Sequence, residues 1–275
     1  MTPFRGDRRA LVGVVHLSPL PGSPRWVDAG RPRVEALAAR AVTDARAYLE
    51  AGFDGLVVEN FGDAPFFKQA PPEAVAALTR CALEVVAAAG ERPVGINVLR
   101  NDAHAALACA VACGARFVRV NVHTGVAVTD QGVIEGQAAR TLRLRASLGA
   151  DRAGPHPVAV FADVHVKHAR PLGGEELRDA ARDAVERGLA DALVVTGSAT
   201  GSAPEAERLE EVRQALPAAP LWLGSGLSPD LCPRLVPLVD GAIVGSAAKR
   251  GGRAEQPVDP DRAAALARAF RTADR

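Results

Sequence analysis

Three polar residues alternate along an apolar run in the middle of the chain: Asp163, His165 and Lys167 are separated by single valines. If this run is a strand, side chains two residues apart point to the same face. A carboxylate beside an imidazole or an amine can shift a pKa towards neutrality, which general acid–base catalysis and Schiff-base formation both require. The spacing therefore predicts a site for proton transfer or carbonyl chemistry.

Polar residues also stand at the ends of other short apolar runs. The first run ends at His16 and the second at Glu59, while the third contains Asn97. In the fourth run, Arg119 and Asn121 alternate and would share one face. We assign His16 and Glu59 to catalysis, together with the three residues above, and the other three side chains to orienting the substrate.

Three of these side chains offer a further kind of chemistry. Glu59, Asp163 and His165 could together hold a divalent metal ion, because carboxylate oxygens and imidazole nitrogens are common metal ligands. Spacing along the chain does not separate this hypothesis from acid–base or Schiff-base chemistry, so the cofactor stays unknown. The Gly-x-Gly-x-x-Gly motif of nucleotide cofactors does not follow the first run.

Two neighbouring runs near the C-terminus end in glycine and serine, at residues 224–226 and 245–246. Glycine lets backbone N–H groups approach an anion without crowding, and a helix that starts directly behind adds partial positive charge. The loops after the seventh and eighth strands of (β/α)8 barrels commonly bind phosphate in this way. The predicted phosphate and substrate contacts are Thr196, Gly197, Gly224, Ser225, Gly226, Gly245 and Ser246.

Each assignment has a purely structural alternative. His16 could be a hydrogen-bonded core residue, and Asp102 could cap the helix that follows it. Arg119 could pair with Asp163 or Glu59 only to neutralise buried charge. The Thr-Gly and Gly-Ser-Gly segments could serve turns and close packing. These alternatives explain each group singly, but they do not explain why all the groups fall at the same end of the predicted strands.

Eight short apolar runs alternate with segments of helical periodicity, and glycines follow several of the predicted helices. This alternation predicts an α/β fold of parallel strands, and we expect a single (β/α)8 TIM barrel over residues 1–275. Residues 124–136 read as a small hairpin inserted after the fourth strand. In such a barrel the polar residues described above would meet at one mouth. The predicted strands cover residues 11–15, 56–58, 94–99, 117–122, 158–166, 193–195, 221–223 and 242–244.

Composition excludes several classes of protein. The chain has 275 residues, 48% of them hydrophobic, and a net charge of +1 without a basic or acidic block, so nucleic acid is not an expected partner. No apolar run approaches the roughly 18 residues of a membrane span, and the first residues do not resemble a signal peptide. We therefore expect a soluble, cytoplasmic protein. The four cysteines lack disulfide or Cys-x-x-Cys spacing. Cys109 and Cys113 are one helical turn apart and could share a metal, but packing is their expected role.

Six segments of the chain together resemble the BtpA/SgcQ family, over a range from about residue 10 to the C-terminus. The resemblance implies a barrel of the ribulose-phosphate-binding kind. The family is named for a role in photosystem I biogenesis in cyanobacteria, and members in other organisms carry nucleosidase-like or sugar-metabolism labels. The segments are VVHLSPLPGSPR at 14–25, ENFGDAPF at 59–66, NVLRND at 97–102, RVN at 119–121, DVHVKH at 163–168 and VTG at 195–197.

Two classes of function remain open. The first is an enzyme acting on a small phosphorylated metabolite, a sugar phosphate or a nucleoside-derived compound, as a phosphosugar lyase, an isomerase or a nucleosidase-like hydrolase. The second is a non-catalytic assembly or stability factor for a larger complex, as the resemblance implies. Aromatic residues in predicted loops also suggest a homo-oligomer, because one barrel hides them poorly. These residues are Trp26, Phe61, Phe66 and Phe67.

Overall fold

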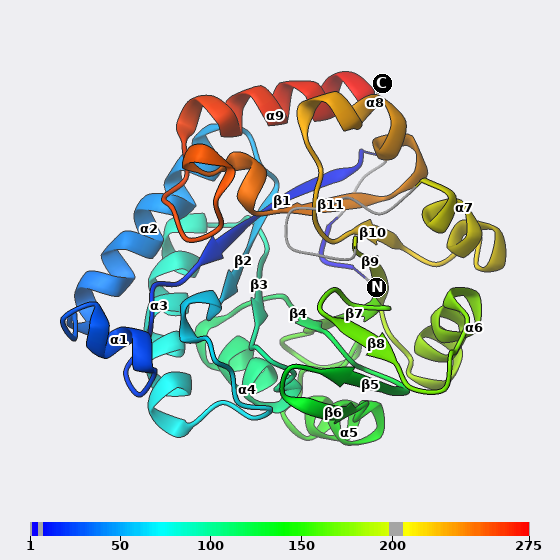
Figure 1. The fold of residues 1–275 in the computed structure, drawn as a ribbon, viewed down its shortest axis with the longest axis horizontal. Coiled ribbons are helices and arrows are strands. Elements are labelled where there is room, and N and C mark those ends of the chain that lie inside the picture. Colours follow the sequence, from blue (N-terminus) through cyan, green and yellow to red (C-terminus); the bar gives the residue numbers. More distant parts are fainter. Residues whose placement is uncertain (1, 5–7, 198–205, 275) are drawn as a thin grey trace.

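Eight parallel strands form a closed barrel in the computed structural model, which describes residues 2–4, 8–197 and 206–274. Helices surround this ring of strands (Figure 1). The predicted (β/α)8 barrel is confirmed, and each predicted strand corresponds to an observed one. The barrel strands are β1 (Ala10–His16), β2 (Gly55–Glu59), β3 (Val94–Asn97), β4 (Phe117–Val120), β7 (Ala159–Val164), β9 (Ala192–Val195), β10 (Leu221–Leu223) and β11 (Gly241–Val244).

The outer helices bury one apolar face each against the barrel. In α2, for example, Leu37, Ala41, Ala45 and Tyr48 are buried, at the spacing of a helical stripe. Asp102 caps α4 by accepting a hydrogen bond from the N–H of Ala105, which confirms the structural alternative for this residue. The helices are α1 (Pro24–Asp28), α2 (Val34–Glu50), α3 (Pro72–Ala89), α4 (Ala103–Cys113), α5 (Ala138–Ser147), α6 (Leu177–Arg182), α7 (Ala206–Ala215), α8 (Cys232–Leu235) and α9 (Pro260–Ala273).

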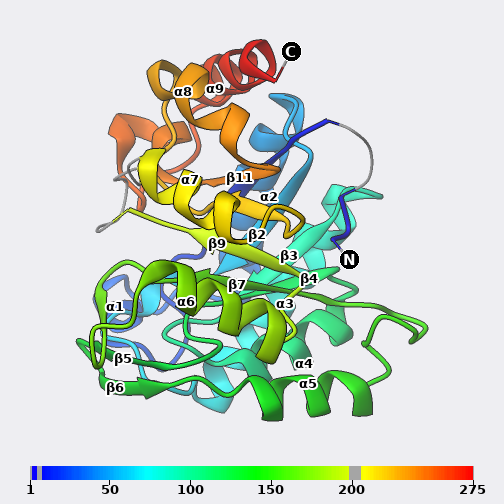
Figure 2. The same ribbon diagram turned by 90° about the vertical axis from the view of Figure 1, so that its right-hand side faces the viewer.

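The inserted segment after β4 forms the predicted hairpin, in which β5 (Val126–Thr129) pairs with β6 (Gly132–Glu135). A third strand, β8 (Ala169–Pro171), pairs with β5 and was not predicted. Its three residues are too few for an alternating pattern, and its proline is compatible only with an edge strand. Figure 2 shows this small sheet and α1 at the end of the barrel opposite the N-terminus. The small sheet therefore lies beside the loops that follow the barrel strands.

Apolar side chains fill the barrel interior. Phe117, Phe161 and Trp222 point inwards from three strands, and Phe4 packs against them with ring centroids 5.0–6.5 Å away. Aromatic rings at these distances contribute more than their buried area alone. Because Phe4 precedes β1, it lies at the amino end of the strands. The interior is therefore a packed core that closes at the end opposite the carboxyl ends of the strands.

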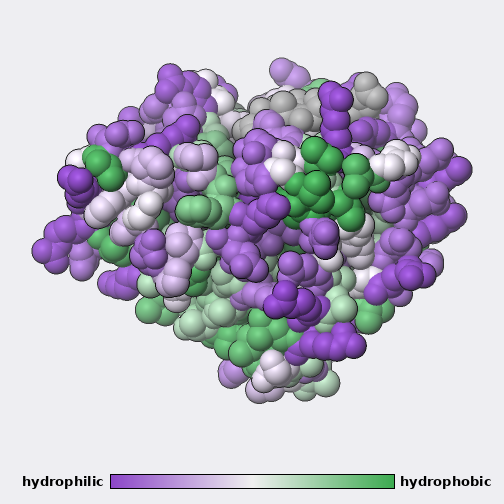
Figure 3. Space-filling view, turned by 60° about the horizontal axis from the view of Figure 1, so that its bottom comes forward, coloured by the Kyte–Doolittle hydropathy of each residue, from purple (hydrophilic) through white to green (hydrophobic). Residues whose placement is uncertain are grey.

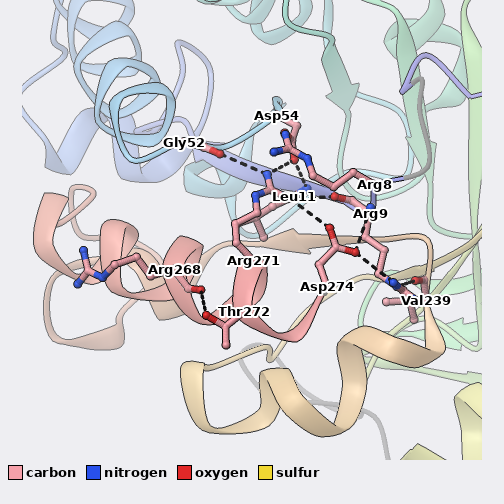
Figure 4. A network of polar contacts seen from close by, with 10 residues as sticks. All are labelled: Arg8, Arg9, Leu11, Gly52, Asp54, Val239, Arg268, Arg271, Thr272 and Asp274. Carbon is pink, nitrogen blue, oxygen red and sulfur yellow. Dashed lines mark hydrogen bonds and ion pairs between the residues drawn. The ribbon is translucent and has the colours of Figure 1, made fainter.

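An ionic network ties the C-terminal helix to the start of β1 (Figure 4). Arg271 donates to the carbonyl of Arg9 at 2.9 Å, and Arg9 pairs with Asp274 at 3.1 Å. Asp54 accepts from the N–H of Leu11 at 2.7 Å. A network at the amino end of the strands serves stability, because chemistry in a TIM barrel takes place at their carboxyl ends. This network therefore belongs to the scaffold.

Cys81, Cys109, Cys113 and Cys232 are free and buried, and Cys109 Sγ lies 2.9 Å from Thr79 Oγ1, which confirms packing as the role of the predicted helical pair. Within the described ranges, no helix combines the length and the apolar character needed to cross a bilayer.

Candidate functional site

One inward-facing position near the carboxyl end of each barrel strand carries a residue of the candidate site. The inner core residues Val14, Val57 and Phe117 point into the barrel, so residues two positions further on also point inwards. The strand register aligns His16 with Glu59, Glu59 with Asn97, and Asn97 with Arg119. We call these eight positions the polar layer: His16, Glu59, Asn97, Arg119, Asp163, Thr196, Gly224 and Gly245.

Arg119 and Asp163 form a buried ion pair at the centre of the polar layer. Arg119 Nε lies 3.1 and 3.2 Å from the two carboxylate oxygens of Asp163, and Nη2 lies 3.0 Å from Oδ1. Asn121 also donates to Asp163 through Nδ2. The predicted charge pairing of Arg119 is confirmed. Asp163 is therefore held in place as an acceptor, which limits its freedom to move a proton by itself.

His16, Glu59 and Asn97 form a second group on neighbouring strands. Asn97 Nδ2 donates to Glu59 Oε2 at 2.6 Å, and His16 Nε2 lies 3.6 Å from Glu59 Oε1. His16 Nδ1 lies 3.0 Å from the carbonyl of Ala254, which can only accept, so Nδ1 carries the proton. Burial, followed by Lys249 and Lys167, holds the pKa of His16 well below its ordinary value. Neutral His16 therefore presents the lone pair of Nε2 to Glu59. A proton can be held between these two groups.

Lys167 lies in the loop after β7, and two buried side chains hold its backbone. Its N–H donates to Thr196 Oγ1 at 3.1 Å, and its carbonyl accepts from Arg100 Nη2 at 2.8 Å. No hydrogen bond or ion pair joins its amine to the rest of the described chain. Burial lowers the pKa of Lys167; the negative charges of Glu59 and Asp163 oppose that shift. The amine therefore shares the electrostatic environment of the polar layer.

His165 departs from the predicted arrangement. Strand β7 ends at Val164, and His165 has a left-handed φ of 50°, which breaks the alternation on which a shared face depends. Burial and then the charge of Arg208 lower the pKa of its ring, and His165 and Arg208 line the same cleft. The prediction that Asp163, His165 and Lys167 share one face is wrong. Only Asp163 and Lys167 are brought together at the polar layer.

The predicted metal ligands are separated for the same reason. Glu59 and Asp163 belong to the polar layer, whereas His165 lies in the cleft beside α7. A search of residues 2–4, 8–197 and 206–274 for three or more His, Cys, Asp or Glu side chains grouped around a common point gives no such group. A metal bound by these three residues would require a rearrangement of the loop after β7.

The glycine loops (residues 224–226 and 245–246) border the polar layer at the ends of β10 and β11. A Cβ at Gly224 would lie 2.5–2.6 Å from methyl groups of Val194 and Thr196, and one at Gly245 would lie 2.7 Å from His16 Cε1. Both positions therefore exclude any side chain. Arg119 Nη1 donates to the carbonyl of Gly224 at 3.3 Å. These glycines bring backbone close to the residues of the site.

A helix was expected directly behind each glycine loop, and this expectation is wrong: only short 3-10 turns follow. Residues 246–248 make a single 3-10 turn, and the next turn after Gly226 begins only at Pro229. Such short turns add little dipole charge, because the helix dipole depends on many aligned peptides. The N–H groups at the start of the turn, at Ser246 and Ala247, still lack an acceptor within it. Phosphate binding here stays a prediction that depends on backbone amides and nearby cations.

Two functional candidates were absent from the predicted site residues. Arg100 is buried directly after β3; besides holding Lys167, it donates to Asn121 Oδ1 at 3.2 Å. Lys249 has no exposed surface and pairs with Asp44 at 3.0 Å. Both are cationic residues that follow the end of a barrel strand by a few positions. This position in the sequence could have indicated them as site residues. Gly197 borders the cleft beside α7, and Ser225 is buried.

Eight parallel strands with ionisable side chains gathered at their carboxyl ends define a TIM-barrel protein. The chain belongs to the BtpA family, whose model matches residues 7–272. It is 46% identical over 260 residues to Photosystem I biogenesis protein BtpA of Synechocystis, which covers 94% of this chain and 87% of that protein. An uncharacterized protein of Thermococcus kodakarensis is also 46% identical over 260 residues, 94% of each chain.

The solved structures that resemble this chain include N-(5'-phosphoribosyl)anthranilate isomerase from Pyrococcus furiosus. The match has a TM-score of 0.57 at 11% identity and covers 96% of this chain and 98% of that one. At this identity the likeness establishes the TIM-barrel fold.

Proposed function

We propose that this protein is an enzyme that performs carbonyl chemistry on a small phosphorylated metabolite, with Lys167 as the reactive amine. The observation that carries the proposal is the amine of Lys167, which has no partner among the described residues and whose pKa both Glu59 and Asp163 influence. A lysine with a lowered pKa holds more of the neutral amine, which is the nucleophile. An ordinary structural lysine would be paired, as Lys249 is with Asp44.

The chemistry that follows is the formation of a Schiff base. The neutral amine of Lys167 adds to the carbonyl carbon of the substrate, and the resulting carbinolamine loses water to give an imine. Loss of the hydroxyl requires a proton, which the His16 and Glu59 pair is placed to supply. Arg119 and Asn121 fix Asp163, whose negative charge can stabilise the positively charged imine.

The phosphate of the substrate would bind at the glycine loops. These loops border the polar layer on β10 and β11, and they present backbone that no side chain can cover. Arg119 contacts the carbonyl of Gly224 and adds positive charge nearby. A sugar phosphate or a nucleoside-derived phosphate would then place its carbonyl towards Lys167. This geometry favours a phosphosugar lyase or isomerase over a nucleosidase-like hydrolase.

Binding measurements test the phosphate part of this proposal. Calorimetric titration with small sugar phosphates should show binding, whereas the matching unphosphorylated sugars should bind at least tenfold more weakly. Ser225→Trp should abolish binding by filling the glycine loops, and Ser147→Trp at the exposed end of α5 is the matched control. Equal binding of Ser225→Trp and wild type would contradict it. Loss of activity with a chelator, restored by added metal, would instead favour metal chemistry at Glu59 and Asp163.

A second candidate function is assembly of a larger complex, proposed because of the name of the Synechocystis relative and an exposed apolar surface. Figure 3 shows hydrophobic residues gathered in patches on one face. A groove of about 580 Å³ is lined by Phe67 and Val133, which are 66% and 45% exposed. Val128 and Leu172 are exposed as well. Such a surface fits a protein partner or a second copy of the chain.

The surface and the polar layer can be tested separately. Under the assembly hypothesis, Phe67→Ser and Val133→Ser should abolish the cellular phenotype while Lys167→Met leaves it intact. The enzyme hypothesis predicts the reverse.

Of the four aromatic residues on which homo-oligomerisation was predicted, only Phe67 is exposed, whereas Phe61 packs against His16 with ring centroids 4.5 Å apart. A homo-oligomer therefore stays a proposal, which light scattering can test.

A further inference from the structure

A cleft of about 480 Å³ lies beside the polar layer, between the small sheet, the end of β9 and the first turn of α7. Its lining includes Val166 and His168, on either side of Lys167, and Thr196 of the polar layer, but no residue of the glycine loops. Its polar lining residues are Thr129, Asp130, His165, His168, Arg170, Thr196 and Arg208.

The charge that lines this cleft is largely of one sign. Arg170 and Arg208 carry fixed positive charges, and His165 and His168 can add to them. Asp130 is the acidic residue among the described lining residues. A concave site with an excess of cations concentrates anions, because the low-dielectric walls focus the field. The cleft is therefore suited to a negatively charged ligand.

Buried polar side-chain atoms in the cleft have no hydrogen-bond partner among the described residues. Arg208 Nε and Nη2 and His165 Nε2 are buried and form no hydrogen bond with the described part of the chain. Arg208 forms no ion pair with Glu211, one turn along α7, in the described structure. Leaving a buried charged donor unsatisfied is costly, and natural proteins rarely do so without a functional reason.

We propose that this cleft is an oxyanion-binding site for a phosphate or carboxylate group, distinct from the glycine loops. The planar guanidinium of Arg208 offers Nε and Nη2 as two parallel donors, the arrangement that matches two oxygens of one oxyanion. His165 Nε2 lies in the same cleft as a second donor when the ring is protonated. Arg170 adds long-range attraction from β8.

The His165 ring gives the site an internal reporter. Arg208 lowers the pKa of His165, whereas the carboxylate of Glu211 and a hydrogen bond with the backbone of Glu175 raise it; burial has the largest effect and lowers it. His168, Arg170 and Asp130 complete the charged groups around the cleft. A bound oxyanion favours the imidazolium form, so binding should raise the pKa of this ring.

The left-handed backbone at His165 places the ring in this cleft and not over Lys167. That conformation is uncommon for a residue with a side chain, and histidine is among the residues that adopt it most readily. The same loop connects the polar layer to the small sheet through β8. An oxyanion in the cleft would therefore contact the segment that carries Lys167, without depending on the chemistry of that lysine.

The test measures inorganic phosphate and sulfate binding to the full chain by isothermal titration calorimetry. Arg208→Met should weaken binding to the cleft at least tenfold. Arg208→Lys, which keeps the charge but loses the two-donor geometry, should weaken it several-fold. Arg182→Met is the matched control, because Arg182 is an exposed arginine on α6 with only a 3.7 Å surface pairing. Arg208→Lys keeps the test valid should Arg208→Met fail to fold.

Two further results decide the proposal. Lys167→Met should leave oxyanion binding in the cleft intact. If Lys167 forms no Schiff base, the proposed function fails but this inference is unaffected. Sulfate keeps one charge state over the measured range, and its affinity should rise as the pH falls through the titration of His165. Wild-type affinity and stoichiometry in Arg208→Met, or sulfate affinity independent of pH, would overturn the proposal.

Discussion

Thr196 Oγ1 accepts a hydrogen bond from the backbone N–H of Lys167 at 3.1 Å, and this contact joins the end of β9 to the loop after β7. Thr196 is fully buried, and its strand neighbour Val195 is part of the barrel core. The rigid barrel thereby fixes a loop residue. The reactive amine that we propose is positioned by the scaffold, although it lies outside every strand.

Thr196→Val tests this positioning directly. Valine matches threonine in shape but leaves the N–H of Lys167 without its acceptor, which should cost about 1–3 kcal/mol of stability. Trapping of a carbonyl ligand on Lys167 should fall at least tenfold, whereas Thr196→Ser, the matched control, should retain most of it. Denaturant unfolding and mass spectrometry measure the two effects. Equal trapping in the valine and serine variants would show that the contact has no positioning role.

The ionisation of Lys167 should respond to Glu59. The carboxylate of Glu59 raises the pKa of Lys167 against the larger effect of burial, so Glu59→Gln should lower that pKa further. Competitive labelling with acetic anhydride across a pH series measures this, with the exposed Lys68 as an internal reference. Glu84→Gln, on the outer face of α3, is a matched control. A rise in the pKa of Lys167 in Glu59→Gln would contradict the account.

Removal of one partner of the buried Arg119–Asp163 pair should lower the free energy of unfolding strongly. Arg119→Met leaves the carboxylate of Asp163 buried without its cation, and this should cost about 3–5 kcal/mol. The double variant with Asp163→Asn removes the unpaired charge and should recover part of that loss. Urea unfolding of both variants decides the matter. A single variant that unfolds at the wild-type midpoint would show that the pair contributes little.

Stability should fall as the pH drops from 7.5 to 5.5. Burial lowers the pKa of His123 below its ordinary value of 6.5, so the unfolded chain binds its proton at a higher pH than the folded chain does. Its Nε2 lies 2.7 Å from the carbonyl of Gly188, and its buried Nδ1 has no hydrogen-bond partner in the described structure. His16 and His165 act in the same direction.

His123→Gln isolates one part of this pH dependence. The amide of glutamine can donate to Gly188 but does not titrate, so the variant should lose less stability than wild type between pH 7.5 and 5.5. Burial raises the pKa of Asp63, and protonation of this carboxyl group therefore changes stability in the opposite direction. Identical pH slopes for the variant and wild type would remove His123 from the explanation.

The sequence predicted the barrel well because the signals for strands and helix ends are local. The polar layer was also predictable, since seven of its eight members follow an inward-facing core residue by two positions, and Asn97 follows Gly95 in the same way. His165 was not, because a single left-handed residue after Val164 reverses the direction of the side chain. Alternation need not continue beyond the last residue of a strand: it fails at His165, although it holds at Thr196, one residue after β9 ends.

Contacts between distant segments also could not be predicted from the sequence pattern. Lys249 and Asp44 are 205 positions apart, and nothing near either residue indicates the partner. Arg100 appeared only within the segment at 97–102 and received no role, whereas its guanidinium donates to the loop after β7. Long side chains such as arginine connect elements whose spacing is fixed only when the barrel closes.

Borohydride reduction is the most direct test of the central claim. The chain has only three lysines, Lys68, Lys167 and Lys249, so a reduced adduct can be assigned to one of them by peptide mass spectrometry. With a panel of phosphorylated aldehydes and ketones, we predict a stable adduct on Lys167 and none in Lys167→Met. The exposed Lys68 and the buried, paired Lys249 should stay unmodified. Adducts on Lys68 alone, or none with any member of the panel, would contradict the proposed carbonyl chemistry.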